Sequence, residues 1–301
     1  MNDLPDPVAW ATPFFVALII GEMIYGRLSG RTSFEPKDTG ASMVMGFGST
    51  ISGVVFGFIG LGAYLWAYEY RIFDLGFVWW AWALCFLAED LVYYGFHRTA
   101  HRVRWFWASH VIHHSSQHYN LSTALRQTWT SPFSIRFIFR LPLFLIGFEP
   151  AMVFFCIGVN LVYQFWIHTE AVGKLGPFEW VMNTPSHHRV HHATNSKYLD
   201  ANYAGVFIIW DRMFATFVEE DEKEPPHYGI IRNLGTFNPL KVAFHEWVAM
   251  YKDLAGARGC REVAGYVCGP PGWSPDGSRL TTNAIKASWR ARQAEGPLTA
   301  E

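Results

Sequence analysis

The histidines of this sequence are the first sign that the protein has a chemical function. The chain holds 13 histidines, and all but two of them lie between His97 and His192. Most gather in three short clusters, HRTAH, HVIHH and HRVHH, which repeat spacings of three and four positions. Side chains at these spacings share one face of an α-helix and lie close enough to bind one metal ion. Imidazole is a suitable ligand for zinc, copper, iron and nickel, so the clusters indicate a metal site.

The clusters supply more ligands than one ion needs. A zinc ion usually takes four ligands, whereas the clusters together with His168, in QFWIHTE, supply nine. One HxxxH pair is a weak signal, but three clusters are hard to explain as unrelated surface histidines. We therefore expect two ions, with the ligands His97, His101, His110, His113, His114, His168, His188, His191 and His192.

Other polar residues near the clusters are candidates for ligands or for partners of a ligand. His187 and His118 are candidates either for ligands or for partners that orient a ligating imidazole. Asp90 lies seven residues before the first cluster, inside an apolar stretch where a carboxylate is costly unless it is paired. It is expected either to accept a hydrogen bond from a histidine of the first cluster or to pair with an arginine. His227 and His245 have no clustered neighbours, and we expect no metal role for them.

Five long apolar stretches predict helices in a membrane. Half of the residues are hydrophobic and only 16% are charged, against about 25% in a typical soluble domain. A bilayer core needs about 20 apolar residues per helix. The stretches cover residues 8–26, 42–68, 77–96, 135–148 and 151–167, and the last two are short enough for a tilted or re-entrant hairpin with its turn at Glu149-Pro150. The predicted fold is an all-α integral membrane protein with about four to five spanning or re-entrant helices and a cytosolic, histidine-rich di-metal cap.

The basic residues predict the orientation of these helices. Arg27, Arg31 and Lys37 follow the first stretch, and more arginines follow the third. Because basic loops stay in the cytosol, the N-terminus is expected outside and every histidine cluster inside. The membrane would be the inner membrane of a bacterium or the endoplasmic reticulum of a eukaryote. The first stretch has no cleavage site and is expected to be retained.

The spacing of the first two clusters predicts a break between them. His101 and His110 are nine residues apart, so on one continuous helix they would face opposite ways. We therefore expect a bend within residues 102–109, with the aromatic residues there in the membrane interface. The predicted organisation is membrane helices in 1–76, a catalytic domain in 77–254 and a cytosolic tail in 255–301, disordered at its end.

The net charge, the cysteines and the segment 208–217 each lead to a further expectation. The net charge of −1 gives no reason to expect nucleic acid as a partner. The four cysteines form no CxxC pair, and Cys85 and Cys156 lie in apolar stretches, so we expect reduced, buried thiols. The segment 208–217 is expected either to cover the metal site, with Trp210 and Phe214 toward lipid, or to be an ordinary packing segment.

Two cytosolic, all-histidine metal sites beneath apolar helices suggest oxygen chemistry on a lipid. Iron with nitrogen ligands can use O₂ to attack an unactivated C–H bond, provided that an outside donor supplies electrons and the site is shielded from water. The alternatives outside this class are a metal transporter, which would hold its ligands near the bilayer midplane, and a zinc-stabilised scaffold.

The clusters resemble those of a known family. HRTAH, HVIHH and HHRVHH are similar to the histidine boxes of the fatty acid hydroxylase superfamily, which includes the sterol desaturases. NLSTALRQT, NTPSHHRVHH and NYAGVFIIWDRMFATF resemble its alkylglycerol monooxygenase branch and bacterial sterol-desaturase-like relatives, and the likeness runs from about Phe86 to Leu240. The resemblance implies a non-haem di-iron centre held by the nine histidines.

The resemblance also implies a reaction. Hydroxylation of the carbon beside an ether oxygen gives a hemiacetal, which collapses to an aldehyde and glycerol. The branch uses tetrahydrobiopterin, but this sequence has Arg102 where the animal enzymes have glutamate. The donor therefore stays open among tetrahydrobiopterin, ferredoxin and a cytochrome. The alternative within the superfamily is a desaturase or hydroxylase of sterols or fatty acyl chains.

Overall fold

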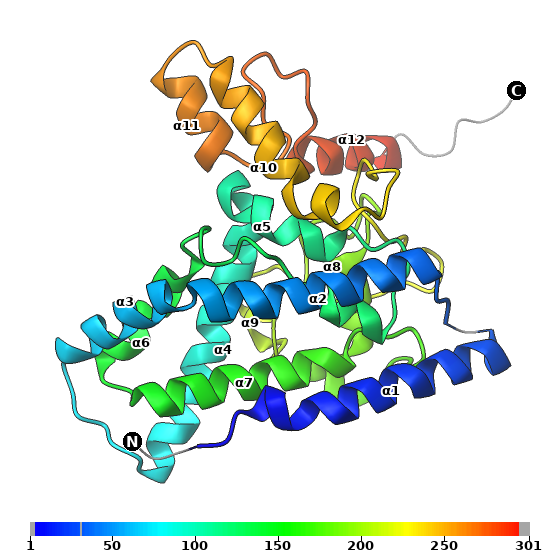
Figure 1. Cartoon of the computed structure of the whole chain (residues 1–301). Helices are drawn as coiled ribbons and strands as arrows, with labels where there is room; N and C mark the ends of the chain where they lie inside the picture. Colours follow the sequence, from blue (N-terminus) through cyan, green and yellow to red (C-terminus); the bar gives the residue numbers. More distant parts are fainter. Residues whose placement is uncertain (1–3, 31, 295–301) are drawn as a thin grey trace, which may run out of the picture.

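Two long apolar helices begin the chain in the computed structural model, which describes residues 4–30 and 32–294. Helix α1 (Pro7–Ser29) starts where the Asp6 carboxylate accepts hydrogen bonds from the first turn, and it ends at Gly30, whose φ of 68° suits glycine. Helix α2 (Pro36–Phe56) follows and runs back across the molecule (Figure 1). Both are long and apolar enough to cross a membrane, and most of their surface is uncovered by protein. The prediction of membrane helices is confirmed to this extent.

The predicted stretch 42–68 is divided in the structure. Helix α2 ends at Phe56, and α3 (Phe58–Glu69) follows after Gly57. Glycine has low helix propensity, and this glycine-rich stretch breaks there. Helix α4 (Trp79–Arg102) contains most of the third predicted stretch, but Glu89, Asp90 and two arginines interrupt its apolar character.

The predicted stretch 135–148 does not form a spanning helix. It holds one 3₁₀ turn, η2 (Arg136–Arg140), and the six-residue α6 (Leu141–Ile146). Gly147 ends α6 with a φ of 112°, and a side chain there would collide with the Phe73 carbonyl. Helix α7 (Pro150–Trp166) then covers the predicted stretch 151–167 and begins at Pro150, which was expected in the turn. Helices α3, α4, α6 and α7 enclose one apolar core, which includes the free thiols of Cys85 and Cys156 as predicted.

The predicted bend between the first two histidine clusters is confirmed. Helix α4 ends at Arg102, Val103 is extended with φ −123° and ψ 119°, and α5 (Arg104–His114) begins at once. The aromatic residues of α5 pack on protein: the Trp105 indole donates to the Ser134 carbonyl, and the Trp107 ring contacts that of His101. After α5 the chain forms the 3₁₀ turn η1 (Leu121–Leu125) before η2, α6 and α7. A further 3₁₀ turn, η3 (Gly176–Trp180), then leads to α8 (Pro185–His192) and the short α9 (Ile209–Met213).

The last part of the described chain is helical rather than an extended tail. Helices α10 (Pro239–Ala255), α11 (Cys260–Cys268) and α12 (Thr282–Ala294) lie together at one end of the molecule, next to α5 (Figure 1). Arg104, at the start of α5, pairs with Glu246 and Asp253 of α10 and fixes this arrangement. The disorder predicted for the end of the chain concerns residues 295–301, which lie outside the described residues.

Candidate metal centre

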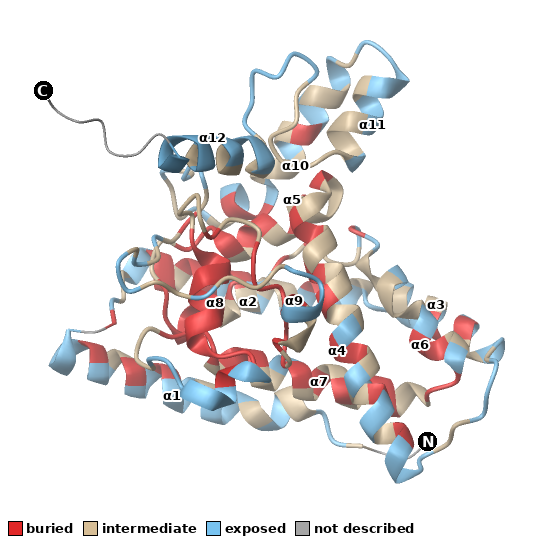
Figure 2. Cartoon of the chain, turned by 180° about the vertical axis from the view of Figure 1, so that it is seen from behind, coloured by how far each residue is buried: buried red, intermediate tan, exposed pale blue. Residues whose placement is uncertain are grey.

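All nine histidines predicted as ligands come together in two groups. In each group the candidate ligand nitrogens lie within 4.8 Å of one another. Group 1 consists of His97, His101, His110, His114 and His191, and group 2 consists of His113, His168, His188 and His192. They come from the ends of α4 and α7 and from α5 and α8, and Figure 2 shows that α8 lies among the most deeply buried parts of the protein.

Helices α5 and α8 each divide their histidines between the two groups. Helix α5 gives the i, i+4 pair His110 and His114 to group 1 and the intervening His113 to group 2. In α8 the i, i+4 pair belongs to group 2, while His191 belongs to group 1. Neighbouring residues on a helix point about 100° apart, so one HxxHH cluster faces two adjacent sites.

The distances within the groups suit a metal ion. The Nε2 atoms of His97 and His110 are 2.9 Å apart, and those of His168 and His188 are 3.0 Å apart. Two nitrogens bound to one ion at about 2.1 Å, at a right angle, would lie about 3.0 Å apart. The imidazoles therefore converge as they would around an ion.

Backbone carbonyls orient several of the rings. The Nδ1–H groups of His97, His168 and His191 donate to the carbonyls of Tyr203, Gln164 and Ala201 at 2.7, 2.7 and 2.9 Å. This leaves each Nε2 lone pair free for a metal, as is usual where a second contact fixes a ligating histidine.

A carboxylate replaces the carbonyl at one ligand. The Asp200 carboxylate faces Nδ1 of His101 at 3.5 Å, and it also lies 3.5 Å from the Arg102 guanidinium.

Histidine ring nitrogens that are buried without a partner show whether these residues fit a metal ion. The Nε2 atoms of His101 and His191 are buried and have no hydrogen-bond partner among the described residues. Burial is also the main reason that the pKa of His191 lies well below its usual value and that of His113 falls to about 4. A neutral imidazole is the form that binds metal, so the residues fit an ion.

His118 and His187, which were expected to be either ligands or partners of a ligand, lie outside both groups. His118 is half-buried, and its Nδ1 lies 3.2 Å from the Asp38 carboxylate. His187 is buried against the Phe217 ring, with Nε2 3.9 Å from Glu179.

Asp90 has neither of its two predicted partners. Its carboxylate accepts hydrogen bonds from the backbone N–H groups of Val206 and Phe207 and from the side chains of Asn160 and Trp210. Arg140 pairs with the neighbouring Glu89, at 2.8 Å, and not with Asp90. Asp90 therefore ties α4 to the segment after Tyr203, a role that depends on backbone groups and is not visible in the sequence.

The segment 208–217 is anchored inward, contrary to the prediction for Trp210, whose indole donates to Asp90. Phe214 is exposed and stacks on Tyr94. The buried carboxylate of Asp211 accepts from the N–H groups of Tyr203 and Ala204, each at 2.8 Å. This segment thus supports the residues whose carbonyls and rings contact group 1.

A buried ion pair behind group 2 was missed by the sequence analysis. The guanidinium of Arg126, in the quoted phrase NLSTALRQT, is fully buried and pairs with Asp38 of α2. The Arg126 carbonyl lies 3.3 Å from Nδ1 of His113. The pair therefore connects α2 to a candidate ligand, and the polar surroundings of both residues in the sequence gave no signal of it.

Comparison with known proteins agrees with this geometry. Residues 82–216 match the family model described as fatty acid hydroxylase. The alkylglycerol monooxygenases of Homo sapiens and Danio rerio are each 41% identical to this chain, over 93% of the chain and 63% of the relative. An ornithine lipid hydroxylase of Rhizobium tropici is 31% identical over 40% of the chain and 37% of its own length.

The chain spans about 63% of the length of the first two relatives. No solved structure matches it significantly. The resemblance predicted from the histidine clusters is confirmed: residues 82–216 match the fatty acid hydroxylase model, and the chain is similar to alkylglycerol monooxygenases over most of its length.

Proposed function

We propose that this protein is a membrane-bound, non-haem di-iron monooxygenase that hydroxylates a lipid, with the ether-linked carbon of an alkylglycerol as the first candidate position. The observation that carries the proposal is the pair of all-histidine groups within a fatty acid hydroxylase domain. The names of the relatives, alkylglycerol monooxygenase and ornithine lipid hydroxylase, support a lipid substrate.

The donor set favours iron over a structural zinc ion. Group 1 offers five imidazoles, whereas structural zinc sites are almost always four-coordinate. Neither α1 nor α2, the two candidate spans, contains a histidine. This argues against a transporter, whose ligands would lie on the spanning helices near the midplane.

The protein's own residues would hold, orient and shield the centre. Iron bound there would supply the activation of O₂ and the attack on the C–H bond. The carbonyls of Tyr203, Gln164 and Ala201 keep the ring tautomers fixed. Burial of the candidate ligands excludes water that would otherwise compete with the substrate.

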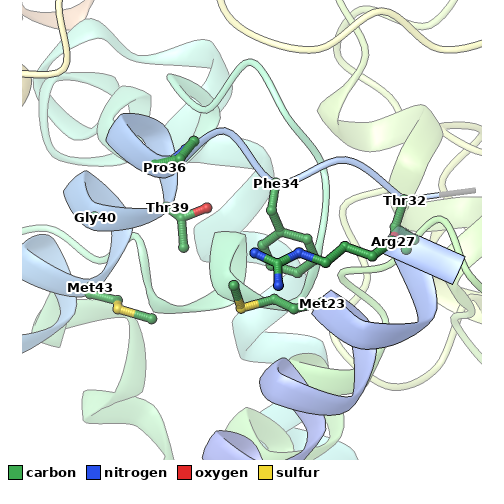
Figure 3. Close-up of a pocket in the computed structure, with 9 residues that line it drawn as sticks. Met23, Arg27, Thr32, Phe34, Pro36, Thr39, Gly40 and Met43 are labelled. Atoms are coloured by element: carbon green, nitrogen blue, oxygen red, sulfur yellow. The ribbon is translucent and has the colours of Figure 1, made fainter. Parts of the chain in front are cut away.

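A cavity between α1 and α2 is a candidate position for part of the lipid. It has a volume of about 380 Å³, within the range of small-ligand pockets. Met23, Phe34 and Met43 give it apolar walls, and Arg27 and Thr39 add polar groups (Figure 3). We expect a leucine at Gly40, where a side chain meets no atom within 4 Å, to raise the KM for lipid.

The electron donor is proposed to be tetrahydrobiopterin, a ferredoxin or a cytochrome, used beside O₂. Arg102 follows the candidate ligand His101 directly and is partly exposed, with Asp200 and Asn283 as partners. Supplying each donor class in turn to the iron-loaded protein, with lipid and O₂, would identify the one that supports product formation.

Lipid mass spectrometry tests the proposal most directly. Membranes of a host that expresses the protein, supplied with ether lipids, are compared with membranes carrying His191→Ala. Loss of an ether lipid, or a product heavier by one oxygen, only with the unchanged protein supports monooxygenation. A product lighter by two hydrogens would instead indicate a desaturase. A protein without iron and without product would refute the proposal.

We also propose that the histidine groups face the cytosol. The exposed thiols of Cys260 and Cys268 on α11 allow a test. A maleimide that cannot cross membranes should label them in inverted vesicles and leave them unlabelled in intact cells. Labelling in intact cells would reverse the orientation.

A further inference from the structure

Tyr203 carries a buried hydroxyl that the fold leaves unused. The side chain is fully buried, and its hydroxyl has no hydrogen-bond partner among the described residues. An unsatisfied buried polar group costs free energy, and native proteins hold few of them. The position therefore calls for a partner from outside the chain.

The ring of Tyr203 forms part of the wall of group 1. Its centroid lies 5.3 Å from that of His101 and 5.9 Å from those of His97 and His191. The backbone is held on both sides, since its N–H donates to Asp211 and its carbonyl accepts from His97. The ring position is therefore set by the same contacts that orient a candidate ligand.

Two other unpartnered atoms lie beside it. Nε2 of His101 and Nε2 of His191 are also buried without partners, and their two rings are 4.8 Å apart. Three unpartnered polar atoms thus belong to mutually contacting rings on one side of group 1. A tyrosine hydroxyl is a hydrogen-bond donor, so this side chain can donate to a ligand that binds beside it.

Group 2 provides a contrast within the same molecule. Tyr119 is equally buried, and its ring lies 5.2 Å from that of His192 and 5.8 Å from that of His168. Its hydroxyl, however, donates to the Ile167 carbonyl at 3.0 Å. One tyrosine beside the candidate centre is therefore structural, and the other is left with a free donor.

We propose that Tyr203 is the hydrogen-bond donor of group 1 toward a small oxygen ligand, either O₂ or water, and that this side of group 1 is where such a ligand enters the centre. The inference rests on the proposed function, because it requires metal in group 1. It assigns different tasks to the two groups: group 1 receives the exogenous ligand, and group 2 is closed by Tyr119.

The test compares Tyr203→Phe with Tyr119→Phe in the full chain, reconstituted in lipid nanodiscs. The first measurement is thermal unfolding of the metal-free protein. Tyr203→Phe should unfold at the same temperature as the unchanged protein or higher, since it removes an unsatisfied group. Tyr119→Phe should unfold at a lower temperature, because it leaves the Ile167 carbonyl without its donor.

The second measurement uses azide as a probe of the iron-loaded protein, followed by its absorption band. Tyr203→Phe should bind azide about tenfold more weakly, which corresponds to ~1.4 kcal/mol for one hydrogen bond. Tyr119→Phe should keep the azide affinity of the unchanged protein.

Each other outcome has a distinct meaning. If Tyr203→Phe destabilises the metal-free fold as Tyr119→Phe does, the hydroxyl has a partner in the protein and the inference is wrong. Equal azide affinity in Tyr203→Phe and the unchanged protein, or equal weakening in both variants, also overturns it. An unchanged protein that takes up no iron would instead refute the proposed function, and the inference with it.

Discussion

Replacing Asp90 by asparagine should destabilise the protein far more than the size of the change suggests. One carboxylate oxygen accepts from the N–H of Val206 and from Asn160 at 2.8 and 2.9 Å. The other accepts from the N–H of Phe207 and from the Trp210 indole at 3.0 and 2.8 Å. An asparagine keeps one oxygen and turns an NH₂ group toward the other two donors.

The magnitude follows from those two donors. Each buried donor left without an acceptor costs about 1–3 kcal/mol, so Asp90→Asn should cost about 2–6 kcal/mol. The segment that loosens begins just after Tyr203, whose carbonyl orients His97. Iron occupancy should therefore fall together with stability.

The matched control is Asp74→Asn, the same chemical change at an exposed position. Asp74 pairs with Arg71 on the surface, and an exposed ion pair contributes little to stability because solvent screens it. Chemical denaturation in detergent micelles, with iron measured on the same samples, compares the two variants. If Asp90→Asn is no less stable than Asp74→Asn, the Asp90 carboxylate does not hold the segment and the reasoning is refuted.

Three further predictions concern the metal, the packing and pH. His191→Ala should lower bound iron measured by elemental analysis, whereas His118→Ala, outside both groups, should not; equal iron in both would contradict the grouping. Gly205→Ala should destabilise the fold, because its Cβ would lie 2.7–2.9 Å from Asn160, Asp90 and Tyr93 atoms; Gly53→Ala, with open space around it, should be neutral in the same melting experiment. Burial lowers the pKa of His113 from 6.5 to about 4. Its stabilising contribution is therefore present above pH 6.5 and is lost as pH falls toward 4, at about 1.4 kcal/mol per pH unit. A melting temperature of the metal-free protein that does not fall between pH 7 and 5 would contradict this.

Local features of the chain could be predicted from the sequence. The three histidine clusters identified eight of the nine imidazoles that come together, because residue type and helical spacing are properties of short segments, and the ninth, His168, was added from the end of an apolar stretch. The bend before α5 followed from the angle between His101 and His110, and Val103 provides it. The apolar stretch 151–167, after the turn expected at Glu149-Pro150, corresponds to α7 within one residue at each end.

Features that depend on distant partners were decided only by the tertiary structure. Residues 135–148 were expected to form part of a membrane hairpin, yet they fold into two short turns, in which Arg140 pairs with Glu89 of α4 and Gly147 lies against the Phe73 carbonyl. The role of Asp90 depends on backbone N–H groups 116 and 117 positions away. The type of a residue does not tell which distant backbone groups will lie next to it.

The division of the ligands is the clearest case of what the sequence left open. The repeated HxxHH pattern predicted two ions, but nothing in the pattern indicated that α5 and α8 would each serve both groups. That outcome depends on the rotation of each helix about its axis, which is set by packing against α4 and α7. The sequence by itself determined which side chains are available for the chemistry, because that is a matter of residue type. Only the folded chain decided which of them share a site, because that depends on contacts between segments far apart in sequence.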